Sequence, residues 1–156
     1  MRWAVEQDYD QLLQLMANAI EADPSPYTLE QRRAWRSRLL TGSSWNDRLR
    51  DQAVLLAEDA DGPLGFMSLK PDGYVDLAYI RSDARGRGVF RSLYTQIETR
   101  AREHGLSLLT THASLAAEGP FRSMGFSVRD RETVTINGEG LRRAAMEKRL
   151  EGTRVS

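Results

Sequence analysis

The clearest chemical signal in the sequence is a short segment, residues 81–91, that combines arginines with two glycines. Four arginines stand here against a single acid, Asp83, and the apolar spacing of a helix begins at Phe90. A helix N-terminus already carries unpaired N–H groups and partial positive charge, so each added cation is unfavourable by roughly 0.3–1 kcal/mol. A bound polyanion removes this conflict, because Gly86 and Gly88 let the backbone approach phosphate oxygens closely. We therefore expect a phosphate-bearing ligand, although a solvated turn with scattered arginines is the simpler alternative.

A buried acid is the next candidate for chemistry. Asp76 lies in the middle of an apolar segment that reads as a strand, where aspartate is depleted. If it faces a half-buried cleft, burial raises its pKa toward that of a general base, whereas on a wet face it has no role. Strict alternation places Asp76 on the face of Tyr74, Ala78 and Ile80, opposite Leu77 and Tyr79.

Two further side chains are candidates for proton transfer. His112 is centrally placed and has an ordinary pKa near neutrality, but a structural histidine is the alternative. Tyr79 can serve as a reserve acid, although an aromatic residue on a buried strand face is more often part of the core.

The composition limits other kinds of chemistry. The chain has 156 residues, 22 Lys plus Arg against 22 Asp plus Glu, two His and no Cys. This length predicts one domain over residues 1–150, followed by a polar tail at 151–156. Without cysteine and with two lone histidines, we expect no metal site and no thiol nucleophile. Zero formal charge, and the lack of a signal peptide or long apolar run, predict a cytoplasmic protein without nucleic-acid or membrane partners.

The elements that must position these residues form an α+β pattern with a mixed sheet. Helices are predicted at about 9–22, opened by a capping box of Asp8 and Gln11, and from Thr28 with Gln31 toward Gly42. Only these two precede the first long strand. Strands at 53–58, 64–69 and 74–80 then form an antiparallel meander.

The second half of the chain predicts a crossover and a hairpin. A helix from about residue 90 ends at Gly105, and strand 106–112 runs parallel to strand 74–80. A short helix follows, with Pro120 placed in its first turn. Strands 126–136 and 141–150 pair across the Asn137–Gly138 turn. The expected total is about seven strands and about four helices.

The loop before the central helix and the segments around it resemble those of the GNAT acetyltransferase superfamily. The family's phosphate-binding loop reads Arg or Gln, two residues, Gly, one residue, then Gly or Ala; Arg85 and Gly88 match it, and Phe90 replaces the small residue. Strand 75–80 is similar to the family's fourth strand, and segment 121–126 to its aromatic-glycine-aromatic signature. The resemblance covers about residues 50–150 and implies the GNAT fold, with a central meander and one splayed parallel strand pair.

The resemblance also implies an acyl-CoA-dependent N-acyltransferase. Its donor is acetyl-CoA, its acceptor the primary amine of a small molecule, and its route direct attack in a ternary complex without a metal. The implied donor contacts are the main chain of Ala78, Tyr79 and Ile80, the loop residues Arg85, Gly86, Arg87, Gly88, Val89 and Phe90, then Arg91, Ser92, Ser114 and Phe121.

One departure keeps other functions open. Many relatives have a tyrosine, acting as the acid, where this chain has Phe121. A catalytically weak acyl-CoA-binding sensor or partner module is therefore an alternative, and a general nucleotide-phosphate protein is another. For an acceptor site we expect an aromatic wall of Tyr27, Trp35 and Trp45, unless Trp35 only seals its helix against the sheet. Exposed aromatic residues near Trp45 would permit a homodimer.

Overall fold

The structure is a computed structural model that describes residues 1–150. It is an α+β fold with a seven-stranded sheet in the order β1-β2-β3-β4-β5-β7-β6. The strands are β1 (Arg2–Trp3), β2 (Ala53–Asp59), β3 (Gly62–Leu69), β4 (Tyr74–Ile80), β5 (Leu108–Ser114), β6 (Ser127–Ile136) and β7 (Glu139–Arg149). The helices are α1 (Tyr9–Glu21), α2 (Leu29–Ser37), α3 (Gly42–Arg50), α4 (Val89–Glu103) and α5 (Leu115–Ser123), with short 3-10 turns at Glu6–Asp8 and Ser82–Ala84.

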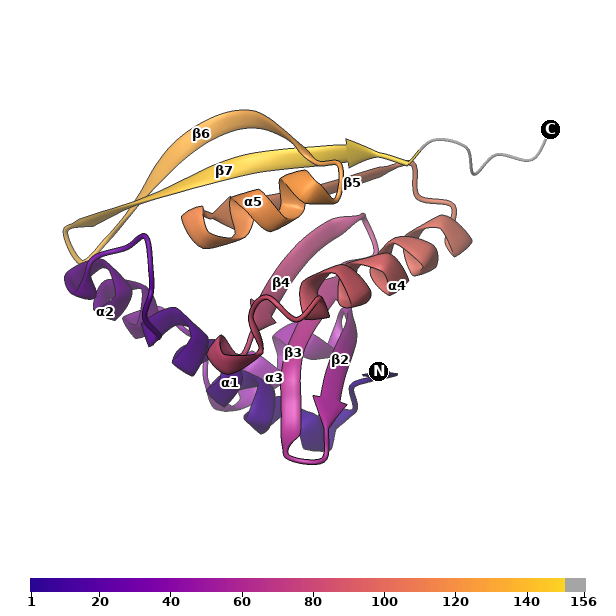
Figure 1. Ribbon diagram of the computed structural model, residues 1–156, viewed down its shortest axis with the longest axis horizontal. Coiled ribbons are helices and arrows are strands. Elements are labelled where there is room, and N and C mark those ends of the chain that lie inside the picture. Colours follow the sequence, from indigo (N-terminus) through magenta and orange to yellow (C-terminus); the bar gives the residue numbers. More distant parts are fainter. Residues whose placement is uncertain (151–156) are drawn as a thin grey trace.

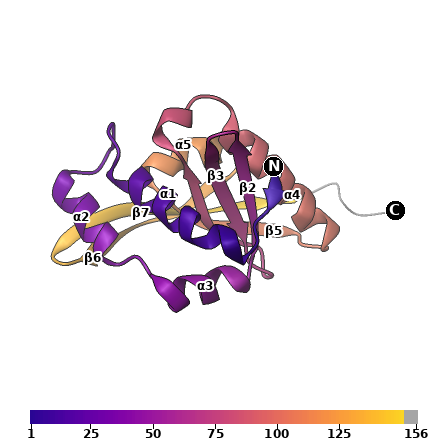
Figure 2. The same cartoon turned by 90° about the horizontal axis from the view of Figure 1, so that it is seen from below.

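Two hydrophobic layers hold the helices against the sheet. Leu93, Ile97 and other residues of α4 pack with Phe121 on one face. Leu12 of α1 packs with Trp45 of α3 on the other face. Figure 2 shows α1 and α3 on the near side of the sheet. The predicted meander β2-β3-β4 and the β6-β7 hairpin are both confirmed.

The sheet divides into two halves between β4 and β5. These strands are parallel, as predicted, but they pair only at Tyr74 with Thr110 and at Val75 with Thr111. Beyond these pairs they separate, and Figure 1 shows β2, β3 and β4 running in a clearly different direction from β5, β6 and β7. The separation leaves the last part of β4 without a neighbour on that side, which creates the site described below.

A β-bulge in β4 changes which side chains share a face. Ser68 pairs with Leu77 and Leu69 with Val75, so Asp76 is an extra residue between two pairs. Ala78 packs on the α4 side, whereas Leu77 and Tyr79 pack on the α1 side. Asp76 bonds to Arg48 of α3 and so shares the face of Tyr79. The predicted grouping of Asp76 with Ala78 and Ile80 is therefore wrong, because it assumed unbroken alternation.

Several predicted helix details also differ from the structure. Helix α3 was not predicted, and Gly42 begins it rather than ending the preceding helix. Asp8 does not cap α1; its carboxylate accepts the N–H of Val5 at 2.7 Å and both ends of the Arg2 guanidinium at 2.8 Å. The capping box of Thr28 and Gln31 is confirmed.

Pro120 lies in the interior of α5 and not in its first turn. A proline crowds the residue before it when that residue is helical and carries a Cβ. Gly119 precedes Pro120 and has no Cβ, which lessens this conflict. Helix α5 therefore continues to Ser123 through the proline.

Candidate active site

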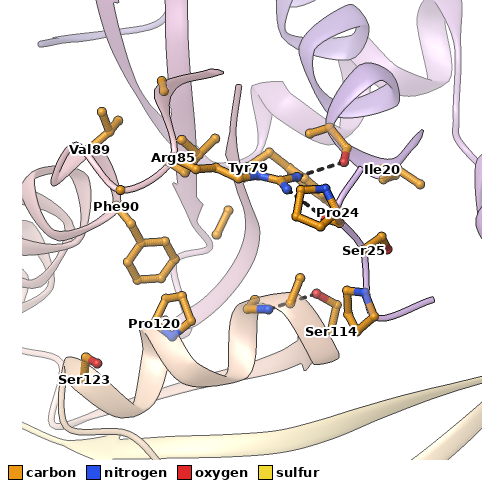
Figure 3. A pocket seen from close by; sticks show the side chains of 18 of the residues that line it. Ile20, Pro24, Ser25, Tyr79, Arg85, Val89, Phe90, Ser114, Pro120 and Ser123 are labelled. Atoms are coloured by element: carbon orange, nitrogen blue, oxygen red, sulfur yellow. Dashed lines mark hydrogen bonds between the residues drawn. The ribbon is translucent and has the colours of Figure 1, made fainter. Parts of the chain in front are cut away.

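A cavity of about 530 Å³ opens where β4 and β5 separate. It lies between the end of β4, the loop before α4, one face of α5 and the connection from α1 to α2 (Figure 3). Its walls include most of the predicted donor contacts: Ala78, Tyr79, Ile80, Arg85, Gly86, Gly88, Val89, Phe90, Arg91 and Ser114. Arg87 and Ser92 are exposed and lie outside the residues that line it.

The loop before α4 has the backbone geometry of an anion site. Gly86 has φ of +76° and Gly88 has φ of +80°, in the left-handed region that glycine adopts without strain. The first bond of α4 runs from the N–H of Ser92 to the carbonyl of Gly88 at 3.1 Å, so the preceding helical N–H groups have no acceptor within the helix. No acid lies in the first turn of α4, and no atom lies within 4 Å of where a Cβ on either glycine would project. These features fit a diphosphate such as that of coenzyme A.

The Arg85 side chain does not lie over the loop in this structure. Its guanidinium donates to the carbonyls of Ala19 at the end of α1 and of Pro24, both at 3.2 Å. Figure 3 shows it extended across the cavity toward Pro24, with Phe90 opposite Pro120. The arginine thus reaches from the loop before α4 to the α1–α2 connection.

Phe121 lies in the core and not in the cavity wall. Its side chain is 1% exposed and meets Phe90 and Phe126 edge to face, with ring centroids 5.0 Å apart in each pair. Phe121, predicted as a donor contact, is therefore not among the residues that line the cavity. Phe90, which packs against the Phe121 ring, does line it.

A second, smaller cavity lies against the first. Its volume is about 200 Å³, and it shares Tyr27, Trp35, Tyr79 and Ser114 with the larger one. The Tyr27 hydroxyl donates to the Arg142 carbonyl at 2.6 Å and accepts from the Leu115 N–H at 2.9 Å. These shared residues form a wall between the cavities.

The predicted aromatic wall is present in part. Trp35 packs against Tyr27 and Tyr79, with ring centroids 5.6 and 6.4 Å apart. Trp45 is 0% exposed, and its indole N–H donates to the Tyr9 carbonyl at 2.7 Å. Trp45 therefore belongs to the core: it lines neither cavity and offers no exposed aromatic surface of its own.

Asp76 is held as an ionised carboxylate. Burial alone would raise its pKa, but the Arg48 guanidinium donates to both of its oxygens at 2.8 and 2.9 Å, and the Gln52 amide donates at 2.7 Å. These bonds outweigh burial and hold the pKa of Asp76 below its usual value. The expected rise in pKa is therefore wrong, because its partners, Arg48 of α3 and Gln52 before β2, were not predicted.

His112 faces the smaller cavity with two polar neighbours. Its Nδ1 lies 2.7 Å from the Tyr74 hydroxyl, and its Nε2 lies 3.7 Å from Oε1 of Glu132. That same oxygen accepts from Nε of Arg143 at 2.5 Å. Burial raises the pKa of Tyr74, so its phenol stays protonated at neutral pH.

Tyr79 is the other predicted proton donor, and it lines both cavities. Burial raises the pKa of its phenol, so it too stays protonated at neutral pH. Its hydroxyl has no hydrogen-bond partner among the residues that the structure describes, and the oxygen is not fully enclosed by other atoms. The hydroxyl is therefore free to donate.

Sequence reasoning missed four polar residues around the smaller cavity: Arg48, Tyr74, Glu132 and Arg143. Tyr74 had one available signal, its place on the predicted face of Asp76. The others come from an unpredicted helix and from the β6-β7 hairpin, which pairs with β5 across the chain.

Within residues 1–150, no helix is long and apolar enough to span a membrane. No cluster of three or more His, Asp or Glu residues in this range is placed to hold a metal ion.

Comparison with known proteins agrees with this geometry. The model of the acetyltransferase (GNAT) domain family matches residues 23–150. A GCN5-related N-acetyltransferase from Rhodopseudomonas palustris is 34% identical over 96% of this chain and 94% of that one, with a TM-score of 0.87. A ribosomal-protein-alanine N-acetyltransferase from Brucella melitensis is 26% identical over 96% of this chain and 98% of that one, with a TM-score of 0.69.

A more distant structure shares the fold. The PaiA N-acetyltransferase of Thermoplasma acidophilum, solved with coenzyme A, is 16% identical over 96% of this chain and 97% of that one, with a TM-score of 0.70. No curated protein sequence matches the chain. The family match, the sheet with its splayed strand pair and the glycine loop lead to one conclusion: the chain belongs to the GNAT family of N-acetyltransferases, enzymes whose acyl donor is acetyl-CoA.

Proposed function

We propose that this enzyme transfers the acetyl group of acetyl-CoA to the primary amine of a small molecule, by direct attack in a ternary complex. The observation that carries this proposal is the pair of cavities that share a wall where β4 and β5 separate. A donor in the larger cavity and an amine in the smaller one would meet beside Tyr79 and Ser114. The small volume of the second cavity, about 200 Å³, favours a compact acceptor over a protein chain.

The larger cavity supplies the contacts that a donor needs. The glycine loop and the first turn of α4 would hold the diphosphate through backbone N–H groups. The main chain of Ala78, Tyr79 and Ile80 lines the cavity and has no strand partner on the β5 side, so an extended thioester arm would pair with it. An N–H from this stretch would stabilise the oxyanion that forms when the amine attacks the thioester carbonyl.

Two side chains are placed to move the protons of this reaction. As the C–N bond forms and the C–S bond breaks, His112 takes the proton of the attacking amine, and Tyr79 gives a proton to the leaving thiolate. Tyr74 orients the His112 ring through Nδ1. Asp76 is engaged by Arg48 and Gln52, so in this scheme it holds α3 at the cavity and does not act as the base.

A thiol-release assay over a panel of small amines tests the proposal. His112→Ala should lower kcat by about 10²-fold or more, the contribution typical of a general base, while acetyl-CoA binding measured by titration stays unchanged. Tyr79→Phe should lower kcat with the fold intact. His104→Ala is the matched control, since His104 lies at the C-terminal end of α4 and, within residues 1–150, its side chain bonds only to the Arg100 carbonyl.

The two measurements separate the possible failures. Saturable acetyl-CoA binding without acetylation of any amine would contradict transfer to a small molecule. Full activity in His112→Ala would instead contradict the role of the histidine alone.

A further inference from the structure

Arginine side chains outnumber acidic ones in the lining of the smaller cavity. Arg48, Arg142 and Arg143 line it, and Asp76 is the one acid among its described lining residues. The Asp76 side chain is 7% exposed, and both of its oxygens already accept hydrogen bonds. A ligand entering this cavity therefore meets little free carboxylate.

Arg143 is the arginine best placed to meet a ligand. It uses Nε to bond Glu132, and its two terminal nitrogens have no partner among the residues that the structure describes. Its side chain is 39% exposed. Glu132 Oε1 touches both Arg143 and His112, which places the guanidinium beside the proposed base.

The positive charge of Arg143 also acts on two tyrosines that line the cavity. Burial raises the pKa of Tyr74 and of Tyr27, and the positive charge of Arg143 opposes the rise in both. Both tyrosines line the smaller cavity, so the guanidinium lies close to two of its walls. Arg142 also contributes its main-chain carbonyl to the cavity wall, where it accepts a hydrogen bond from the Tyr27 hydroxyl.

Aromatic and aliphatic side chains line part of the cavity beside these charged groups. Trp35 and Tyr79 form one side, and Val134, Ile136 and Leu141 form another. A guanidinium with two free nitrogens in such surroundings binds a carboxylate in a bidentate, charge-assisted manner.

From these contacts we propose that the acceptor is a compact apolar amine that carries a carboxylate, of the size of a free amino acid, and that Arg143 binds this carboxylate. The inference rests on the proposed function and specifies its substrate class. With the carboxylate on Arg143, the amine of the same molecule lies near His112 on the side of the shared wall. Arg143 thus determines specificity, and His112 does the proton transfer.

Matched amines test the carboxylate directly. The panel is the apolar amino acids, each beside its amide and its decarboxylated amine, with thiol release as the readout. The amide has a less basic amine and thus a larger neutral fraction near neutral pH, so amine basicity alone favours the amide. We expect kcat/KM for the free amino acid to exceed both counterparts by about tenfold or more, the effect of one charge-assisted hydrogen bond.

Variants then assign the effect to Arg143. Arg143→Gln should raise KM for the amino acid by about tenfold or more, with KM for the decarboxylated amine and for acetyl-CoA unchanged. Arg143→Lys should recover part of the loss. Arg129→Gln is the control, because Arg129 lies on β6, is paired with Glu147 and is outside both cavities.

A binding measurement keeps the test decisive if turnover is slow. With coenzyme A present, an N-acetylated apolar amino acid should bind more tightly than its amide, and Arg143→Gln should remove the difference. Equal binding, equal rates for amide and amino acid, or preference for a peptide over the free amino acid would overturn the inference. Acetylation restricted to amines that lack a carboxylate would contradict this inference alone and leave the proposed function standing.

Discussion

At the scale of single residues, the hydrogen-bond partners of Asp76 determine the pKa of this buried acid. Its carboxylate has a pKa below the usual value because Arg48 and Gln52 outweigh burial. The folded state then binds fewer protons than the unfolded chain, so this stabilisation is present above the unfolded pKa of about 3.9 and is lost as pH falls through the lower folded pKa.

Asp76→Asn should therefore destabilise the enzyme near neutral pH by about 1.5–3 kcal/mol, the contribution of hydrogen bonds to a charged group. The difference from the natural protein should shrink in acid, below about pH 4. Urea unfolding at a series of pH values measures this. A difference that stays constant down to strong acid would show that the Arg48 pair does not stabilise the fold.

The glycine loop gives a second residue-scale prediction. Gly88→Ala places a side chain at φ of +80°, and Gly105→Ala does the same at φ of +74° at the other end of α4; neither new Cβ meets an atom within 4 Å. Both variants should lose about 1–2 kcal/mol of stability from backbone strain. Only Gly88→Ala fills the space that a diphosphate must enter, so only it should raise the Kd for acetyl-CoA. Equal Kd values in a calorimetric titration would count against the loop as the phosphate site.

At the scale of elements, the second helix supports the wall between the cavities. Thr28 and Gln31 cap α2 reciprocally, at 2.7 and 3.1 Å, and α2 carries Trp35. Thr28→Ala should cost about 1 kcal/mol of unfolding free energy, the usual contribution of such a cap. Thr41, the N-cap of α3, makes no side-chain bond to its helix. Thr41→Ala is therefore the control, and an equal loss in both variants would contradict the capping argument.

The elements also show which structure the sequence could predict. Local patterns were enough for the meander, the glycine loop with its helix, and the Asn137–Gly138 hairpin, where φ is +49° and +79°. Helix α3 offered only Trp45 and Leu49 as an apolar pair, too little to reveal a helix. The bulge at Asp76 depends on register with β3, which no local pattern contains.

The candidate site also has a part that local sequence patterns predict and a part that they do not. The glycine loop is a continuous segment, so its proposed role in donor binding could be predicted from residue types and spacing alone. The smaller cavity combines α2, α3, β4, β5, β6 and β7, and the partners of Asp76 and His112 come from distant parts of the chain. Long-range contacts such as Arg48 with Asp76 and Glu132 with Arg143 therefore appeared only with the fold.

At the scale of the whole molecule, the two halves of the sheet are joined at a narrow place. Besides the pairs at Tyr74 and Val75, the buried hydroxyl of Thr111 on β5 donates to the Val75 carbonyl on β4 at 2.8 Å. This bond lies where the strands begin to separate. It therefore helps to set the opening between the strands at which the larger cavity lies.

Thr111→Val keeps the side-chain shape and removes this donor. We expect a loss of about 1 kcal/mol in unfolding free energy, because the Val75 carbonyl loses a buried hydrogen bond. We also expect weaker acetyl-CoA binding, because the mouth of the splay is less firmly held. The neighbouring hydroxyl of Thr110 has no bonding partner within residues 1–150, so Thr110→Val is the matched control. If Thr111→Val binds acetyl-CoA as tightly as Thr110→Val, the junction of the halves supports the fold without shaping the donor site.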